Sequence, residues 1–490
     1  MYFFLFGCKE KIIKIENNPL KTNKGNIVLI FKHPIENWKF DVEGRGFIHL
    51  GKYEISFNKD SPIPVQWSPD YLKNSDTLII KNVEKNIEIK HKYKGLDEFS
   101  YLLKPNDTIV FEYEKKLPIA KIINREVKKY DINYEILKRK IVVKDDFPAE
   151  VKYNSPFFYM IENQPENQSE VKLIEYKNKR LIKAKSELIL EKKLLDSLLN
   201  KSLLSIDVYN FYVAKNFYSF KTIEVKDGKA TENNYHLKKE NDSLLNFSFY
   251  IKYLKSIVKS EFEKKTEIIN YSNAKIPDYR IVYDSINSSN LFSREVKKHL
   301  SFLWLDFIIN NFSISDIDNY FQKFKQVYKD SILINHFNQE YNLLSGISSE
   351  LNLKDVKNNK TNLQDIINAN KGKVIYIDFW ASWCAPCRRA MPSSIKLKKE
   401  YKNEKIVFVY LALNDKNENW KKAFEEEGLK DFDYNYIIEN SKSSKLIDDL
   451  NLKSIPRYIL YDKMGKLVHQ NAPPPHSEEI RNLLNKYLKE

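Results

Sequence analysis

Two of the chain's three cysteines, Cys384 and Cys387, stand three residues apart. They directly follow an apolar run that predicts a buried strand at residues 374–380. If a helix begins at the first cysteine, its unpaired N–H groups and dipole favour a thiolate there. The second cysteine then lies one turn further along the same face, close enough to form and break a disulfide. This spacing predicts a redox-active dithiol whose chemistry is thiol–disulfide exchange.

Other uses of a cysteine pair need partners that this sequence lacks. A zinc site needs about four ligands, and His469 and His476 are not in the usual His-x₃₋₅-His spacing. Covalent haem attachment needs a histidine directly after the second cysteine, where Arg388 stands. A peroxidatic enzyme would use a single cysteine without this pair. We therefore expect no metal and no cofactor beyond the Cys384–Cys387 disulfide.

The elements around the pair alternate between helix and strand from about residue 351 onward. Such alternation implies an α/β sheet with helices on both faces. The predicted helices are 361–370, from the cysteines to 401, 417–427, 443–450 and 477–488, and the predicted strands are 374–380, 406–413, 434–438, 458–462 and 467–469. Gly465 supplies the positive φ of the turn between the last two strands.

The sequence pattern in the first part of the chain predicts short strands separated by turns. We expect an antiparallel sandwich or small barrel there, with no catalytic constellation. The predicted strands are 27–31, 47–50, 53–57, 77–80, 87–90 and 108–113.

From about residue 151 to 350 the apolar period changes to that of helices, with stripes at 181–198, 250–258 and 296–307. Ser315 and Asp318 resemble a helix cap ahead of aromatic residues at 320–324. We assign these stripes to core packing rather than to a ligand site.

Composition sets the number of domains and the class of partner. At about 150 residues per domain, 490 residues suggest about three folded domains. We divide the chain into a signal remnant (1–8), a β-rich domain (9–150), a helical domain (151–350) and an α/β domain (351–490). The net charge of +15 comes from lysines scattered among acids, which favours a solvated surface over nucleic-acid binding. No run approaches the roughly 20 apolar residues of a transmembrane helix.

The third cysteine, Cys8, suggests where in the cell the protein is located. Leu5-Phe6-Gly7-Cys8 resembles a bacterial lipobox, in which the cysteine is lipidated after signal cleavage. Only seven residues precede it and none is basic, whereas a signal normally has about 15–30 residues and a charged start, so this interpretation places the natural start further upstream. Lipidation would anchor the chain to a membrane and remove the odd thiol. The alternative is a short apolar strand with an incidental cysteine.

The α/β segment resembles thioredoxin-fold proteins of the TlpA/ResA group. The resemblance rests on Phe379-Trp380-Ala381-Ser382-Trp383-Cys384-Ala385-Pro386-Cys387-Arg388-Arg389 and on the later turn Asp462-Lys463-Met464-Gly465-Lys466. It covers about the last 130 residues. Many TlpA-like proteins carry additional β and helical regions ahead of this domain.

The resemblance implies roles for individual residues. Cys384 would be the attacking thiolate, and Cys387 would resolve the mixed disulfide. Asp378 stands where thioredoxins keep a buried acid, whose raised pKa would let it accept the Cys387 proton. A purely structural strand-end carboxylate is the alternative. Ile455-Pro456 matches the cis-proline loop that pairs with the substrate backbone.

Residues next to the cysteines complete the expected site. Ala385, Pro386 and Trp383 would contact substrate, although Trp383 and Trp380 could each be core. Ala385-Pro386 lacks the histidine of strongly oxidising relatives, which predicts a reductant-like potential. Ala390 departs from the glutamate that many relatives place three residues after the second cysteine.

Together these patterns predict a thiol–disulfide oxidoreductase of the bacterial cell envelope or periplasm. Its expected partners are disulfide-bearing envelope proteins and, as the resemblance implies, an integral-membrane thiol-electron donor. The alternative is a surface lipoprotein whose N-terminal domains bind a partner or glycan, the redox domain being accessory.

Overall fold

The computed structural model describes residues 25–32, 54–59, 62, 64–70, 74–93, 97–114, 117–143, 170–228, 235, 237, 239–271, 274–345, 350–430, 433–450, 452 and 454–490. Their contacts divide the chain into two compact units. One contains Met1–Ser260 and Asn290–Val296, and the other contains Glu261–Ser289 and Lys297–Glu490. Helices of the segment 151–350 thus contribute to both units, while the four-part division made from the sequence stays a prediction. Cys8 and the strand predicted at 47–50 lie outside the described residues.

The β-rich part of the first unit consists of two four-stranded sheets. Their orders are β4-β1-β7-β8 and β3-β2-β5-β6. The strands are β1 (Gly25–Lys32), β2 (Glu54–Phe57), β3 (Val65–Trp67), β4 (Ser75–Val83), β5 (Ile87–Tyr93), β6 (Asp97–Leu103), β7 (Thr108–Glu114) and β8 (Leu117–Ile122). Alternate residues of both sheets, such as Phe31 and Ile89, meet in one buried core, as in a sandwich.

The prediction of a wholly antiparallel β domain is wrong for one strand pair. β1 pairs with β7 in parallel, with Val28 opposite Thr108. The other strand pairs described in these two sheets are antiparallel. Both β1 and β7 are apolar runs, and such runs do not encode the direction of their partner. Strands β3, β6 and β8 were not predicted from the sequence.

Helices predominate between residues 170 and 345, as the periodicity predicts. The larger ones are α3 (Glu170–Asn200), α4 (Ile206–Lys226), α5 (Ser248–Glu261), α6 (Tyr279–Ser288), α7 (Arg294–Asn311), α8 (Ile314–Tyr328) and α9 (Ser331–Ser345). The predicted cap at Ser315 is wrong, because Ser313 precedes α8 and its hydroxyl accepts from the Asp316 amide at 3.2 Å. A two-stranded ribbon, β9 (Ile268–Tyr271) with β10 (Ala274–Pro277), interrupts the helices. Among the described residues, no helix is long and apolar enough to cross a bilayer.

Smaller helical segments complete the described helices. In the first unit they are α1 (Tyr134–Lys138), a π-helical segment at Arg139–Val143 and a 3₁₀ segment at Lys239–Asn246, and in the second unit a 3₁₀ turn at Glu263–Lys265. Polar side chains join α4 and α5 to the sandwich. The Tyr212 hydroxyl of α4 donates to the Ser100 carbonyl at 2.7 Å, and the Ser248 hydroxyl of α5 donates to Glu88 at 2.7 Å.

The C-terminal part of the second unit is the predicted α/β domain. Its seven-stranded sheet has the order β12-β11-β15-β14-β13-β16-β17. The strands are β11 (Asn352–Lys354), β12 (Lys360–Asn362), β13 (Val374–Trp380), β14 (Ile406–Ala412), β15 (Asn435–Ile438), β16 (Arg457–Tyr461) and β17 (Leu467–His469). β13, β14 and β15 are parallel, whereas β16 and β17 continue the sheet antiparallel. Strands β11 and β12 were not predicted.

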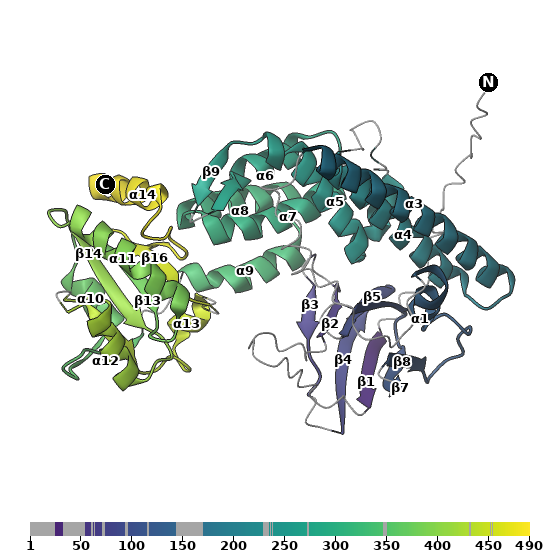
Figure 1. Ribbon diagram of the computed structural model, residues 1–490, viewed down its shortest axis with the longest axis horizontal. Helices are drawn as coiled ribbons and strands as arrows, with labels where there is room; N and C mark the ends of the chain where they lie inside the picture. Colours follow the sequence, from purple (N-terminus) through teal and green to yellow (C-terminus); the bar gives the residue numbers. More distant parts are fainter. Residues whose placement is uncertain are drawn as a thin grey trace. The chain divides into compact units, whose positions relative to one another are not determined.

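Helices cover both faces of this sheet (Figure 1). They are α10 (Leu363–Ala369), α11 (Ala385–Glu400), α12 (Asn417–Glu426), α13 (Lys445–Asp449) and α14 (Glu478–Lys489). All seven residues of β13 are buried, and their side chains alternate between the faces. Tyr376 and Trp380 join the core shared with α11, α12 and α14. Ile375 and Ile377 join the core shared with α10 and α13.

This alternation decides which side chains can reach the cysteines. Asp378 lies between Tyr376 and Trp380 on the face that α11 covers. A strand shifted by one residue would point Asp378 to the opposite core. The alternation of β13 and the packing of α11 therefore place the Asp378 carboxyl beneath the helix that carries Cys387.

Candidate active site

Cys384 is the N-cap of α11, and Cys387 lies in its first turn. The two form a disulfide, with their Cα atoms 5.3 Å apart. The Cys387 amide donates to the Cys384 sulfur at 3.2 Å, so this sulfur occupies the place of an ordinary capping oxygen. Pro386 fits the first turn because it has no N–H to leave unpaired. In the reduced protein, the same N–H and the helix dipole would stabilise a Cys384 thiolate.

The loop before β16 brings Ile455 and Pro456 against the disulfide. The Ile455–Pro456 peptide bond is cis, as the family resemblance implied. The Ile455 carbonyl oxygen lies 3.8 Å from the Cys384 sulfur. The structure therefore places Cys384, Cys387, Ile455 and Pro456 in one small region, although they come from separate parts of the sequence.

The other residues expected to contact substrate lie at the surface around the pair. Ala385 and Pro386 are exposed. Trp383 has 61% of its surface exposed, and its indole N–H donates to the Asn414 carbonyl at 3.1 Å. Trp380 is fully buried in the core between sheet and helices. Of the two tryptophans, Trp383 alone is in a position to meet a substrate.

Asp415 holds the loop that precedes the cysteines and was missed by the sequence reasoning. Its carboxylate accepts from the Ser382 amide at 2.5 Å and from the Ser382 hydroxyl at 2.7 Å. Asp415 follows β14, the neighbour of β13 in the sheet, so the two strand ends lie together. The only signal in the sequence that could have pointed to Asp415 is an acidic residue shortly after a central strand, and such residues are common.

Asp378 is buried as predicted, with 3% of its surface exposed. Desolvation raises the pKa of Asp378 to about 7, and the Ser394 hydroxyl, which donates to the carboxylate at 3.4 Å, acts in the opposite direction. The Ser394 hydroxyl also lies 3.1 Å from the Tyr410 hydroxyl. Asp378 can therefore gain or lose a proton near neutral pH, which a transient proton acceptor must do.

Neither Ser394 nor Tyr410 was singled out from the sequence. Ser394 lies on the buried side of α11, two turns past Cys387, and Tyr410 is on β14 directly opposite Asp378 in the register. Desolvation raises the pKa of Tyr410, so its hydroxyl stays protonated and can serve as a donor.

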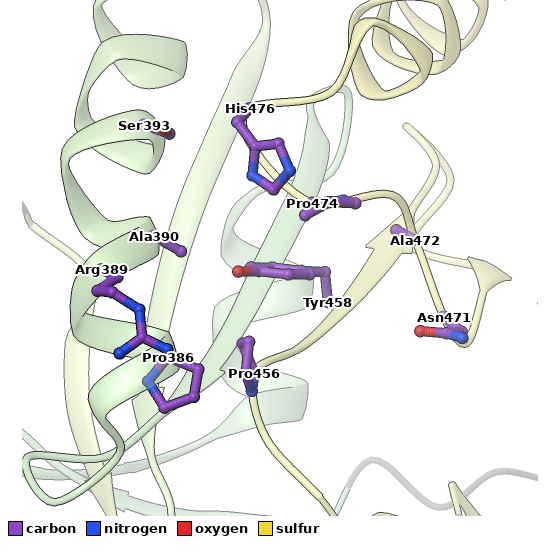
Figure 2. Close-up of a pocket in the computed structure, with 10 residues that line it drawn as sticks. All are labelled: Pro386, Arg389, Ala390, Ser393, Pro456, Tyr458, Asn471, Ala472, Pro474 and His476. Atoms are coloured by element: carbon purple, nitrogen blue, oxygen red, sulfur yellow. The ribbon is translucent and has the colours of Figure 1, made fainter. Parts of the chain in front are cut away.

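A pocket opens beside the disulfide. Its volume is about 500 Å³, and one wall is the exposed side of α11 (Figure 2). Its lining residues are Pro386, Arg389, Ala390, Ser393, Pro456, Tyr458, Asn471, Ala472, Pro474 and His476. Ala390, the departure from the family pattern, lies in this wall, where a glutamate would add a carboxylate. Pro386 and Pro456 connect the pocket to the cysteines.

Within the described residues, no group of three or more His, Cys, Asp or Glu side chains is arranged to hold a metal ion. His469 is buried, and desolvation lowers the pKa of its imidazole to about 4. His476 is exposed and lies on the pocket instead.

Comparisons with known proteins agree with this geometry. Residues 372–467 match a family described as thioredoxin-like. The C-terminal domain is thioredoxin-like and similar to thiol–disulfide oxidoreductases of the TlpA/ResA group. The thiol-disulfide oxidoreductase ResA of Bacillus thuringiensis (strain Al Hakam) is 28% identical over 132 residues, which is 27% of this chain and 71% of ResA.

Two further similar proteins match the same C-terminal part of the chain. The thioredoxin-like protein YneN of Bacillus subtilis (strain 168) is 33% identical over 117 residues, which is 24% of this chain and 64% of YneN. A crystal structure of the thioredoxin domain of thiol-disulfide oxidoreductase BVU-2223 from Bacteroides vulgatus is 25% identical. It covers 28% of this chain and 91% of that domain, with a TM-score of 0.24.

Proposed function

We propose that this chain is a thiol–disulfide oxidoreductase of the bacterial cell envelope that reduces or exchanges disulfides in envelope proteins. The observation that supports it best is the Cys384–Cys387 disulfide at the start of α11, beside the cis Ile455–Pro456 bond. A thioredoxin-like domain with this arrangement needs no cofactor other than its own two sulfurs.

The proposed reaction begins with the reduced dithiol. The Cys384 thiolate attacks one sulfur of a substrate disulfide, forming a mixed disulfide and releasing the other substrate sulfur as a thiolate that takes up a proton. Cys387 loses its proton and attacks Cys384, which re-forms the Cys384–Cys387 disulfide and releases the second substrate thiol. Two electrons pass to the substrate, and a membrane thiol-electron donor would return the domain to its dithiol form.

Asp378 is the proposed acceptor of the Cys387 proton. Its carboxylate lies beneath α11, and its pKa of about 7 suits it to accept and return a proton at neutral pH. The pair Cys384 and Cys387 would carry the electrons, and Ile455-Pro456, Ala385, Pro386 and Trp383 would bind the substrate segment.

The envelope location rests on the lipobox-like Leu5-Phe6-Gly7-Cys8, with Cys8 as the proposed site of lipidation. A lipid anchor would hold the chain at a membrane, within reach of an integral-membrane donor and of exported proteins. Disulfides persist in that compartment, so it offers substrates for exchange.

Trapping tests this function directly. In Cys387→Ser the mixed disulfide cannot be resolved, so natural substrates should accumulate on Cys384 and be released by reductant. Mass spectrometry of the trapped species would identify them. Cys384→Ser, which lacks the attacking thiol, is the matched control and should trap nothing. Equal recovery from both variants would contradict the proposed function.

A further inference from the structure

The pocket beside the disulfide is lined by apolar and polar side chains in equal number, and the Arg389 guanidinium is the permanent cation among them. Figure 2 shows α11 residues Pro386, Arg389, Ala390 and Ser393 on one side, facing Pro456 and Tyr458. Asn471, Ala472, Pro474 and His476 close the remaining side. None of these lining residues is acidic, so an anionic group entering the pocket would meet no carboxylate on its walls.

Arg389 is free to bind such a group. Among the residues that the structure describes, its guanidinium makes no ion pair or hydrogen bond, and the side chain is exposed. The neighbouring Arg388 is already neutralised, because it binds Glu427 at 2.6 Å and Glu426 at 2.8 Å. Arg388 therefore serves to hold α11 against α12, whereas Arg389 is available to a ligand. A guanidinium binds a carboxylate through two parallel N–H···O bonds, which gives it selectivity for that group.

The floor of the pocket offers a second unused polar group. Tyr458 has 4% of its surface exposed, and its hydroxyl has no hydrogen-bond partner among the described residues. In Figure 2 this hydroxyl points across the pocket toward Ala390. Desolvation raises the pKa of Tyr458, so the hydroxyl remains a donor at neutral pH. A buried donor without a partner is costly unless a ligand or water completes it.

The position of the pocket relates it to the substrate. A segment whose sulfur reaches Cys384 must lie against Ile455 and Pro456, since the Ile455 carbonyl is 3.8 Å from the Cys384 sulfur. Pro456 also lines the pocket. A residue next to the target cysteine is therefore the one that would enter it, and about 500 Å³ accommodates any single side chain.

We propose that this pocket is a substrate subsite that takes an acidic side chain adjacent to the target cysteine, with Arg389 as the residue that determines this specificity. The inference rests on the proposed function and adds the substrate class. The carboxylate would bind the Arg389 guanidinium, and its apolar stem would lie on the prolines and the Tyr458 ring.

The test uses the reduced full-length protein and three short peptides. Each carries its cysteine as a mixed disulfide with 2-mercaptoethanol, and they differ only in the next residue, which is Glu, Gln or Lys. The measurement is the second-order rate of disulfide reduction at pH 7 and low ionic strength, where charge is least screened. We expect the Glu peptide to react roughly tenfold faster than the Gln peptide, and the Lys peptide to be slowest.

Substitutions then assign the preference to the pocket. Arg389→Gln should bring the Glu-to-Gln ratio close to one. Ala390→Glu, which adds a carboxylate to the same wall, should reverse the order so that the Lys peptide reacts faster than the Glu peptide. Lys396→Ala removes one exposed charge from α11 outside the pocket and should leave the ratio unchanged.

The outcomes separate this inference from the function on which it rests. Equal rates for the three peptides, or a Glu-to-Gln ratio unaffected by Arg389→Gln, would overturn the subsite while leaving the oxidoreductase intact. Failure of the wild-type protein to reduce any of the three peptides would instead overturn the proposed function. Reduction of the Gln peptide by each variant shows that it is folded and active.

Discussion

At the scale of single residues, the site is organised around one buried carboxyl. Asp378 is surrounded by apolar core on the α11 side of the sheet, and the Ser394 hydroxyl donates a hydrogen bond to its carboxylate. Burial without a cation or several N–H donors favours the neutral form, which is why its pKa is raised to about 7. The same environment that suits proton transfer also destabilises the fold when the carboxyl ionises.

Replacing Asp378 with Asn should slow disulfide reduction near neutral pH by roughly tenfold or more, because the variant cannot accept a proton. It should also be more stable than the wild type at pH 8. The wild-type carboxyl ionises above about pH 4 when unfolded but only above about pH 7 when folded, so stability falls across that window. The difference approaches about 4 kcal/mol above pH 7 and vanishes below pH 4.

Insulin-reduction rates from pH 6 to 9 and urea unfolding of the oxidised protein at pH 4 and pH 8 measure both effects. Ser394→Ala is a milder variant at the same site. It removes the hydrogen bond at 3.4 Å that lowers the pKa of Asp378, so the Asp378-dependent part of the rate profile should move to higher pH. An Asp378→Asn protein with wild-type rates at every pH would remove this residue from the mechanism.

At the scale of elements, the β13–loop–α11 connection determines the reactivity of Cys384. The N-terminus of α11 stabilises the thiolate through the Cys387 N–H and the helix dipole. Asp415 fixes the preceding turn through Ser382, so the sulfur is held at the cap. Ala385 and Pro386 add no positive charge, which limits how far the thiolate is stabilised.

We therefore predict a reduction potential nearer to the about −270 mV of thioredoxin than to the about −120 mV of DsbA. Pro386→His, which places an imidazole between the cysteines, should make the pair more oxidising. Equilibration with glutathione or dithiothreitol buffers, with the oxidised fraction counted by thiol alkylation, gives both potentials. A wild-type value near that of DsbA would contradict this account of the element.

At the scale of the whole molecule, the redox domain is one part of a larger chain. Within its unit, the Gln470 side chain donates to the Ile309 carbonyl of α7 at 3.2 Å, and Ile314 of α8 belongs to the α10–α13 core. The domain is thus packed against helices that precede it in the sequence. The first unit has its own sandwich core.

Lipidation of Cys8 predicts where the whole molecule is found. Expressed from its natural coding region in a bacterial host, the wild-type protein should fractionate with membranes, and Cys8→Ala should appear in the soluble fraction. Each buried CH₂ of an acyl chain adds about 0.8 kcal/mol of membrane affinity, and a lipidated cysteine that bears several chains is stably anchored, so the difference should be nearly complete. Mass spectrometry of the mature N-terminus is the check, and an unmodified Cys8 in soluble wild-type protein would exclude the anchor.

The sequence by itself determined the chemistry and the local scaffold. Cys384, Cys387 and the apolar run ahead of them are adjacent in the chain, so strand, cap and dithiol follow from local pattern. The family resemblance implied that Asp378 lies beneath the pair, and the period-two alternation of β13 in the structure agrees with that placement. The same local reasoning predicted Ser315 as the helix cap, whereas Ser313 is the cap in the structure. Both serines precede apolar residues at helical spacing, so the pattern does not distinguish them.

Only the tertiary structure decided which distant residues complete the site. Ser394 and Tyr410 meet Asp378, and Asp415 meets Ser382, because neighbouring strands and a covering helix bring them together. The parallel pairing of β1 with β7 and the pocket between Arg389 and His476 depend in the same way on how elements pack. Such contacts join residues far apart in the chain, and no local periodicity records them.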